Sequence, residues 1–204
     1  VYASTDPDFI PEDVPVAMAD ISDLKMTIVT NDPTKRYYYT LLFDDKYRVK
    51  IATRNINIPG VQNFRDLGGY PSYSTKKQMR WGMIYRSAEI DSLECSSRRE
   101  LKNLGIKTLI DLRASSEIGR QSPLQKGFNV VHIPLATGDM EDILKGIREE
   151  KIKCDTVYRM VERMNRVLID QYTKEYRQIF DILLDKNSYP VVIHCSSGKG
   201  RTGI

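Results

Sequence analysis

The amino-acid sequence predicts an α/β protein with a central sheet flanked by helices and a small β-rich module at its N-terminal end. The first observation is that short β-branched runs alternate with segments of helical periodicity in the second half of the chain. The second is an apolar run, residues 189–194, that ends directly before a loop of small residues. The third is a set of β-branched and aromatic runs near the N-terminus, separated by turn-forming residues.

The N-terminal part, residues 1–54, is interpreted as an arm followed by an accessory β-rich module. From Val1 to about Val16 the chain is acidic and is expected to be extended. Three runs then predict strands of a small antiparallel sheet: Lys25–Thr30, Tyr37–Phe43 and Tyr47–Ala52. The Asn-Asp-Pro and Asp-Asp sequences between these runs favour turns.

Residues 55–204 are predicted to form the larger domain. Apolar positions from 155 to 184 recur every three or four residues, which predicts one long amphipathic helix or two in line, with Asp155 as N-cap. The apolar stripe of this segment is expected to pack against the sheet. The other expected elements are a helix over Ser96–Leu104 closed by Gly105, and strands over Ile106–Leu112, Val130–Leu135 and Tyr189–His194.

The loop after the last strand is the most informative segment, because it opens with Cys195 and closes with Arg201. Small residues between them let successive backbone N–H groups turn inward as an anion-binding nest, and a helix that begins at Arg201 would add its positive end. Such surroundings lower a thiol pKa from ~8.5 into the ~3.5–7.5 range, so a nucleophilic thiolate is predicted. Arg201 is predicted to hold two phosphate oxygens and Thr202 to donate a hydrogen bond to the sulfur. The predicted phosphate-binding residues are Ser196, Ser197, Gly198, Lys199, Gly200, Arg201 and Thr202.

The run from His194 to Gly203 resembles the signature of the cysteine-dependent phosphatase superfamily. It is most similar to the bacterial tyrosine-phosphatase-like family, which also carries an Asn-Phe-Arg-Asp-Leu-Gly-Gly-Tyr segment, here residues 63–70. Two further elements fit the order of that family: Tyr85–Ala88, and the strand end Ile110–Arg113 with Glu117 just beyond. The resemblance implies a protein-tyrosine-phosphatase-like fold and phosphomonoester hydrolysis through a phosphocysteine intermediate.

Many members of that family have Asp directly before the loop arginine, whereas this chain has Gly200 in a Gly-Lys-Gly-Arg pattern shared with lipid phosphatases of the superfamily. The family resemblance makes phosphotyrosine in a protein the leading expected substrate, and the residues Lys199 and Gly200 favour a phosphoinositide or inositol phosphate as the alternative. A catalytically inactive phosphate-binding module is the third interpretation. The chain ends at Ile204, three residues after Arg201, so the resemblance implies a truncated domain with weak activity in isolation.

Phosphate-ester cleavage also needs a general acid that protonates the leaving oxygen. Asp139 is the first candidate, because it follows the predicted strand Val130–Leu135 in a loop and matches the place of the acid loop in the superfamily. Glu141 and Asp142 are competing candidates. An aspartate between a loop and a helix can also be an N-cap, so a structural role for Asp139 stays open.

Four other residues are considered as supporting groups. Asp66 and the Asp111/Arg113 pair could line the pocket, although Asp-Leu-Gly-Gly also favours an ordinary turn and strand-end charges often pair with each other. His194 is expected to point away from the loop and to hydrogen-bond backbone, orienting the turn at the cysteine. His132 is expected to be structural. With only two histidines, one of them beside the cysteine, no metal site and no cofactor are expected.

The composition suits a globular protein: the chain has 204 residues, of which 41% are hydrophobic. Three cysteines argue against a disulfide framework, and no apolar run is long enough for a membrane span. Residues 1–32 hold one Lys against seven Asp or Glu, which gives this segment a charge of −6. Since the whole chain has a net charge of +4, the remaining residues carry a charge of +10. A basic main body suits an anionic substrate, but the interspersed acids disfavour nucleic acid. The β-rich module and the start at Val1 favour an exported or cell-envelope location over a cytoplasmic one.

Overall fold

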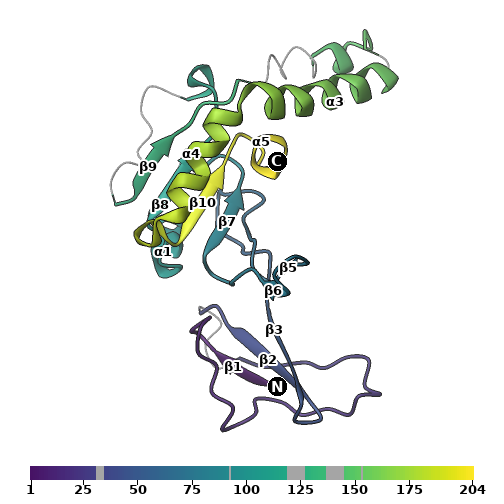
Figure 1. Cartoon of the computed structure of the whole chain (residues 1–204), viewed down its shortest axis with the longest axis vertical. Coiled ribbons are helices and arrows are strands. Elements are labelled where there is room, and N and C mark those ends of the chain that lie inside the picture. The colour runs from purple at the N-terminus through teal and green to yellow at the C-terminus, as the bar shows by residue number, and fades with distance from the viewer. Residues whose placement is uncertain (31–34, 92, 119–126, 137–144, 153) are drawn as a thin grey trace. The chain divides into compact units, whose positions relative to one another are not determined.

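The structure is a computed structural model that describes residues 1–30, 35–91, 93–118, 127–136, 145–152 and 154–204. The chain forms two compact units. The first combines Val1–Ile56 with Asp66–Met83, and the second combines Asn57–Arg65 with Ile84–Ile204. The architecture is mixed α/β, with antiparallel strands in the first unit and a helix-flanked sheet in the second, as the sequence predicts (Figure 1).

The first unit contains a three-stranded antiparallel sheet of β1 (Tyr2–Ser4), β2 (Tyr38–Phe43) and β3 (Tyr47–Ala52). The turn between β2 and β3 has Asp44 and Asp45 at φ values of 48° and 54°, and the Lys46 amide donates to the Phe43 carbonyl at 3.0 Å. Positive φ at both central residues is typical of a type I′ turn, and three residues separate the paired Phe43 and Tyr47. The prediction of a strand at residues 25–30 is wrong, because these residues do not belong to any strand. A strand needs a hydrogen-bonding neighbour, and the edge of β2 opposite β3 pairs with β1, from residues 2–4, instead of with residues 25–30.

A second part of this unit folds around Asp66 and Trp81, beside the short hairpin of β5 (Pro71–Ser72) and β6 (Lys77–Gln78). The fully buried Asp66 carboxylate accepts hydrogen bonds from Arg36 at 2.7 Å, from the Gly68 amide at 2.7 Å and from the Gly82 amide at 2.8 Å. A Cβ atom at Gly68 would lie 2.5 Å from Trp81 backbone, so only glycine fits there. The Asp-Leu-Gly-Gly sequence is therefore a tightly packed turn.

The second unit is built on a five-stranded sheet with the order β4-β7-β10-β8-β9. Its central strands pair in parallel, β10 with both β7 and β8, and β8 with β9. This register places His194 beside Ser87 on one side and beside Asp111 on the other, so three strands end at the same edge. The strands are β4 (Arg65–Asp66), β7 (Ile84–Ser87), β8 (Thr108–Asp111), β9 (Asn129–His132) and β10 (Val191–His194).

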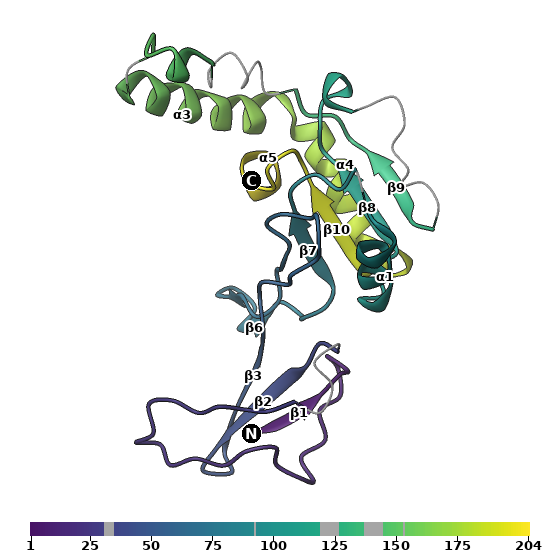
Figure 2. The ribbon, with the colours of Figure 1, turned by 180° about the vertical axis from the view of Figure 1, so that it is seen from behind.

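Helices lie on both faces of this sheet. Figure 1 shows α4 (Thr173–Leu184) over β10 and β8, and Figure 2 shows α1 (Cys95–Asn103) on the opposite face. Gly105 closes α1 as predicted: it has a φ of 71°, its amide donates to the Lys102 carbonyl, and the next amide donates to the Leu101 carbonyl. This pair of bonds is a Schellman cap.

The long amphipathic segment is two helices, α3 (Cys154–Gln171) and α4, which meet at Tyr172. Asp155 lies in the first turn of α3 rather than at its N-cap, because the helix already begins at Cys154. The remaining elements are the short 3-10 turns η1 (Ser115–Glu117) and η3 (Lys186–Ser188), and the terminal helix α5 (Gly200–Gly203). Within the described residues, no helix is long and apolar enough to cross a membrane.

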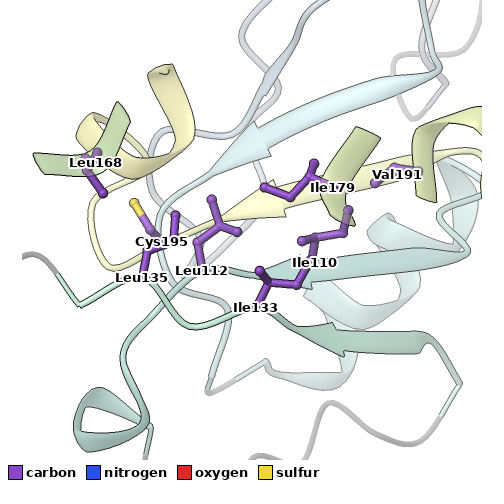
Figure 3. Close-up of a cluster of buried hydrophobic side chains, with 8 residues drawn as sticks. All are labelled: Ile110, Leu112, Ile133, Leu135, Leu168, Ile179, Val191 and Cys195. Carbon is purple, nitrogen blue, oxygen red and sulfur yellow. The ribbon is translucent and has the colours of Figure 1, made fainter. Parts of the chain in front are cut away.

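The main apolar core of the second unit lies on the sheet face covered by α4. Alternate residues of β8 and β10 point to this face, where they meet the last turns of α3 and the middle of α4. Figure 3 shows Cys195 at one end of this core, beside Leu112 and Leu135. The thiol is thus anchored by packing as well as by its loop. The buried members are Ile110, Leu112, Ile133, Leu135, Leu168, Ile179, Val191 and Cys195.

Candidate active site

Cys195 occupies the first position after β10, at the carboxyl edge of the central strand. The residue is 1% exposed, and its sulfur lies 3.1 Å from the Thr202 hydroxyl and 3.2 Å from the Gly198 amide, which donates to it. The structure thus brings together the predicted thiol, the predicted hydroxyl and a backbone donor of the loop.

The electrostatic surroundings lower the pKa of the Cys195 thiol. Burial by itself raises this pKa, but the hydrogen bonds from Thr202 and from the Ser197 and Gly198 amides, together with the charge of Arg201, outweigh it. All of these groups stabilise the thiolate rather than the thiol. The sulfur therefore lies in surroundings that favour its charged form.

Arg201 lies at the other end of the loop and is mostly buried. Its guanidinium donates to both carboxylate oxygens of Glu117, at 2.5 and 2.8 Å, and to the Ser196 hydroxyl at 2.8 Å. The same guanidinium also donates to the Leu135 carbonyl at 3.2 Å. These contacts fix the plane of the fork, which is the geometry that suits a phosphate with two parallel hydrogen bonds.

Glu117 is a site residue that the sequence indicated only as part of a family pattern. Its hydrogen bonds with Arg201 lower the pKa of the carboxyl group to about 2, so the group is ionised at neutral pH. The carboxylate also accepts a hydrogen bond from the Ser196 hydroxyl at 2.5 Å and one from the Ala114 amide at 2.7 Å. The 3-10 turn η1 thereby holds both ends of the loop.

Tyr176 of α4 was not identified from the sequence, where it counted only as a member of the apolar stripe. Its hydroxyl donates to the Arg201 carbonyl at 3.0 Å. Burial and the nearby Cys195 charge raise the pKa of Tyr176 to about 12, so its proton stays available for this bond. The contact ties the arginine backbone to the helix that covers the sheet.

His194 does not make the predicted hydrogen bond to backbone: within the described part of the chain, neither ring nitrogen has a hydrogen-bond partner. Burial lowers the pKa of His194 to about 4, which leaves the ring neutral at pH 7. The ring faces the carboxylate of Asp111, with Nδ1 3.9 Å from its oxygen. The residue therefore fills space under the loop instead of orienting it through hydrogen bonds.

Asp111 and Arg113 form a buried ion-pair cluster with Asp91. The fully buried Arg113 guanidinium donates to Asp111 at 2.7 Å and to both oxygens of Asp91, one of them at 2.7 Å. The Nε2–H group of His132 donates to the Arg113 carbonyl, 2.8 Å away, in keeping with the structural role expected of this residue. These charges pair with one another, so the contacts of this cluster are structural.

The other predicted residues fall in three places. Lys199 and Gly200 are exposed on the loop, as is Ser197. Asp66 belongs to the first unit, where its contacts are with Arg36 and two glycine amides, and a supporting role at the loop stays a prediction. The acid candidates Asp139, Glu141 and Asp142 lie outside the described residues.

A central parallel strand that ends in a buried, activated thiol, with an arginine six positions further on, defines a protein of the tyrosine-phosphatase-like class. The chain belongs to the tyrosine phosphatase family, which it matches over residues 56–204. It is similar to the triple specificity protein phosphatase PtpB of Mycobacterium tuberculosis, with 29% identity over 168 residues, 72% of this chain and 59% of that protein. It is also similar to a Cupriavidus necator protein that carries the name of a tyrosine-protein phosphatase, with 26% identity over 147 residues, 70% of this chain and 52% of that protein. The chain thus spans little more than half the length of these relatives.

Proposed function

We propose that this protein hydrolyses phosphate monoesters with the Cys195 thiolate as nucleophile, and that phosphotyrosine in proteins is its main substrate. The observation that carries the proposal is the sulfur itself, which is buried and receives hydrogen bonds from Thr202 and Gly198 beside the guanidinium of Arg201. An inert buried cysteine has no need of donors that stabilise its charged form.

The reaction would proceed in two displacements at phosphorus. In the first, the thiolate forms an S–P bond, the ester P–O bond breaks, and the leaving oxygen takes a proton from a general acid. In the second, water loses a proton to the same group and attacks phosphorus, and the S–P bond breaks to release phosphate and the thiolate. Arg201 and the loop amides would stabilise the charge on the phosphoryl oxygens, and Thr202 would stabilise the departing thiolate.

Asp139 is proposed as the general acid and then the base, on its predicted place in a loop after β9. The Asp139→Asn variant should lose more activity on an ester with a poor leaving group than on one with a good leaving group, because only the poor leaving group needs the proton. Equal losses on both esters would assign the acid to another residue, and the Asp142→Asn and Glu141→Gln variants would then be compared.

A second substrate class is a phosphoinositide or an inositol phosphate. Lys199 is exposed on the loop beside Gly200, where its ammonium group is available to a further phosphate. One relative is also named a triple specificity phosphatase. The kcat/KM values for a phosphotyrosine peptide and for a soluble inositol phosphate would separate the two classes, and the Lys199→Met variant should lower only the second value if the alternative is right.

The proposal is tested by hydrolysis of an aryl phosphate by the full-length protein in the presence of a chelator. The Cys195→Ser variant should lose all turnover, and rapid acid quenching of the wild-type reaction should trap phosphate on the peptide that contains Cys195. Cys95→Ser is the matched control, because Cys95 is an exposed free thiol at the start of α1 and should be dispensable. Absence of turnover by the wild-type protein would favour a phosphate-binding module instead.

A further inference from the structure

We propose that Asn63 and Arg86 are positioning residues of the active-site loop, which aim its backbone amides at the phosphate by holding its carbonyl groups on the opposite side. This inference deepens the proposed function and rests on it. Both side chains donate hydrogen bonds to the backbone carbonyl groups of residues 197–199 of the loop.

The physical requirement follows from the shape of a nest. When successive N–H groups of a short loop point inward at an anion, the carbonyl groups between them point outward. Outward carbonyls near other segments need hydrogen-bond donors. In this loop the four consecutive carbonyls from Ser196 to Lys199 all receive donors from outside the loop, and among the residues that the structure describes these donors belong to Asn63 and to the segment 86–89.

Asn63 supplies the donor for the middle of the loop. Its side-chain amide donates to the Ser197 carbonyl at 3.0 Å and to the Gly198 carbonyl at 3.1 Å. The residue has a φ of 56°, a left-handed conformation that asparagine adopts more readily than most side chains. Both the backbone conformation and the hydrogen bonds therefore explain why asparagine stands at this position.

Arg86 supplies the donors for the second half of the loop. It lies on β7 directly beside Ile193 of β10, so the sheet register brings its side chain to the loop that follows β10. Its guanidinium donates to the Gly198 carbonyl at 2.6 and 3.1 Å and to the Lys199 carbonyl at 2.8 Å. A rigid planar fork can hold two neighbouring carbonyls at once.

The strand end beside Arg86 completes the support. The Glu89 amide donates to the Ser196 carbonyl at 3.3 Å. Gly198 packs so closely on this segment that a Cβ atom would lie 2.4 Å from the carbonyl oxygen of Ser87. The loop is thus pressed against segment 86–89 and hydrogen-bonded to it. Its amides, including the Gly198 amide that donates to the sulfur at 3.2 Å, are left facing the site.

The test measures the thiol and the phosphate site separately in the full-length protein. The rate of Cys195 alkylation by iodoacetamide is followed against pH by mass spectrometry of its peptide, and inorganic phosphate is used to protect the thiol. In the Asn63→Gly and Arg86→Gln variants we expect the midpoint of alkylation to move upward toward that of a free thiol, ~8.5. We also expect the protecting concentration of phosphate to rise about tenfold, because the amides lose their orientation.

Arg86→Lys keeps the positive charge but offers a single donor nitrogen instead of a planar fork, so it should recover part of both effects. Asn187→Gly and Arg99→Gln replace exposed residues of η3 and α1 and serve as matched controls. Unchanged midpoints and phosphate protection in folded Asn63→Gly and Arg86→Gln proteins would overturn the positioning role. Aryl phosphate turnover by the wild type reports separately on the proposed function, since the alkylation profile needs no turnover.

Discussion

At the scale of single residues, the site depends on groups that stabilise a charge on sulfur. Thr202 contributes the only hydroxyl that the structure places on the Cys195 sulfur within the described residues, at 3.1 Å. A hydrogen bond to a charged partner contributes about 1.5–3 kcal/mol. Its effect should be largest in the step that returns the thiolate, because the sulfur gains its full charge there.

We therefore expect the Thr202→Val variant to lose activity mainly in hydrolysis of the phosphocysteine. Its kcat should fall by about tenfold or more, and rapid-quench kinetics should show a burst of the released alcohol followed by slow turnover. The Thr156→Val variant replaces an exposed threonine of α3 and should behave as wild type. A uniform fall without a burst would show that the hydroxyl acts before the intermediate forms.

The ion pair of Glu117 predicts how the free energy of unfolding depends on pH. The folded protein lowers the pKa of its carboxyl group from about 4.5 to about 2 through Arg201. The ion pair therefore stabilises the fold fully above about pH 4.5, and its contribution is lost as the pH falls toward 2. We expect the free energy of unfolding of Glu117→Gln to fall less between pH 4.5 and pH 2 than that of the wild type. The difference should be no more than about 1 kcal/mol, because the carboxylate is about a third exposed. Urea unfolding of both proteins between pH 2 and 6 measures this difference, and parallel pH dependences would contradict the prediction.

At the scale of elements, the packing of the loop on β7 gives the sharpest test. Gly198 has a φ of 65°, and a Cβ atom there would collide with the backbone of Ser87. Gly198→Ala should therefore displace the loop and lower kcat/KM about a hundredfold, with a loss of about 1–3 kcal/mol in the free energy of unfolding. Gly60→Ala is the matched control, because Gly60 has a φ of 74° but open space around it. Equal activity losses in both variants would implicate backbone strain instead of the collision.

The elements also show what sequence can and cannot predict here. The strand, loop and helix around Cys195 follow from local composition, because small residues and β-branched residues act within a few positions. The strand expected at residues 25–30 is not observed, because a strand is completed by its pairing partner, and the edge of β2 opposite β3 pairs with residues 2–4. Local pattern carries no information about which of two segments pairs with a given strand.

The residues that hydrogen-bond to the active-site loop could not be predicted from local sequence pattern for the same reason. Glu117 reaches Arg201 across 84 positions and Asn63 reaches Ser197 across 134. Each of these residues stands in a segment that fits the family, so the order of the motifs along the chain was the one signal available. That signal indicated which segments are involved but not which of their atoms contact the loop. His194 shows the converse: its position next to Cys195 was evident from the sequence, whereas the absence of a hydrogen-bond partner for its ring within the described residues was not.

At the scale of the whole molecule, the first compact unit is formed by two separate segments, because the chain enters the second unit at residues 57–65 and then returns to the first. The first unit combines residues 1–56 with residues 66–83, whereas the sequence placed the domain boundary after residue 54. The buried Asp66 illustrates the consequence, because its ion pair is with Arg36, on the other side of that boundary. An unpaired buried carboxylate costs about 3–5 kcal/mol.

We therefore expect a chain of residues 55–204 to keep the second unit folded while residues 66–83 unfold. Trp81 is the single tryptophan, belongs to the first unit and is 7% exposed, so its fluorescence reports on this segment alone. Its emission should shift to the red in the shortened chain, while the helical circular dichroism of the second unit remains. In the Arg36→Met variant of the intact chain, the unfolding transition followed by Trp81 fluorescence should occur at a lower urea concentration. The emission wavelength without urea should stay unchanged, because the rest of the unit still encloses the indole. Blue emission from the shortened chain would instead support a domain boundary after residue 54.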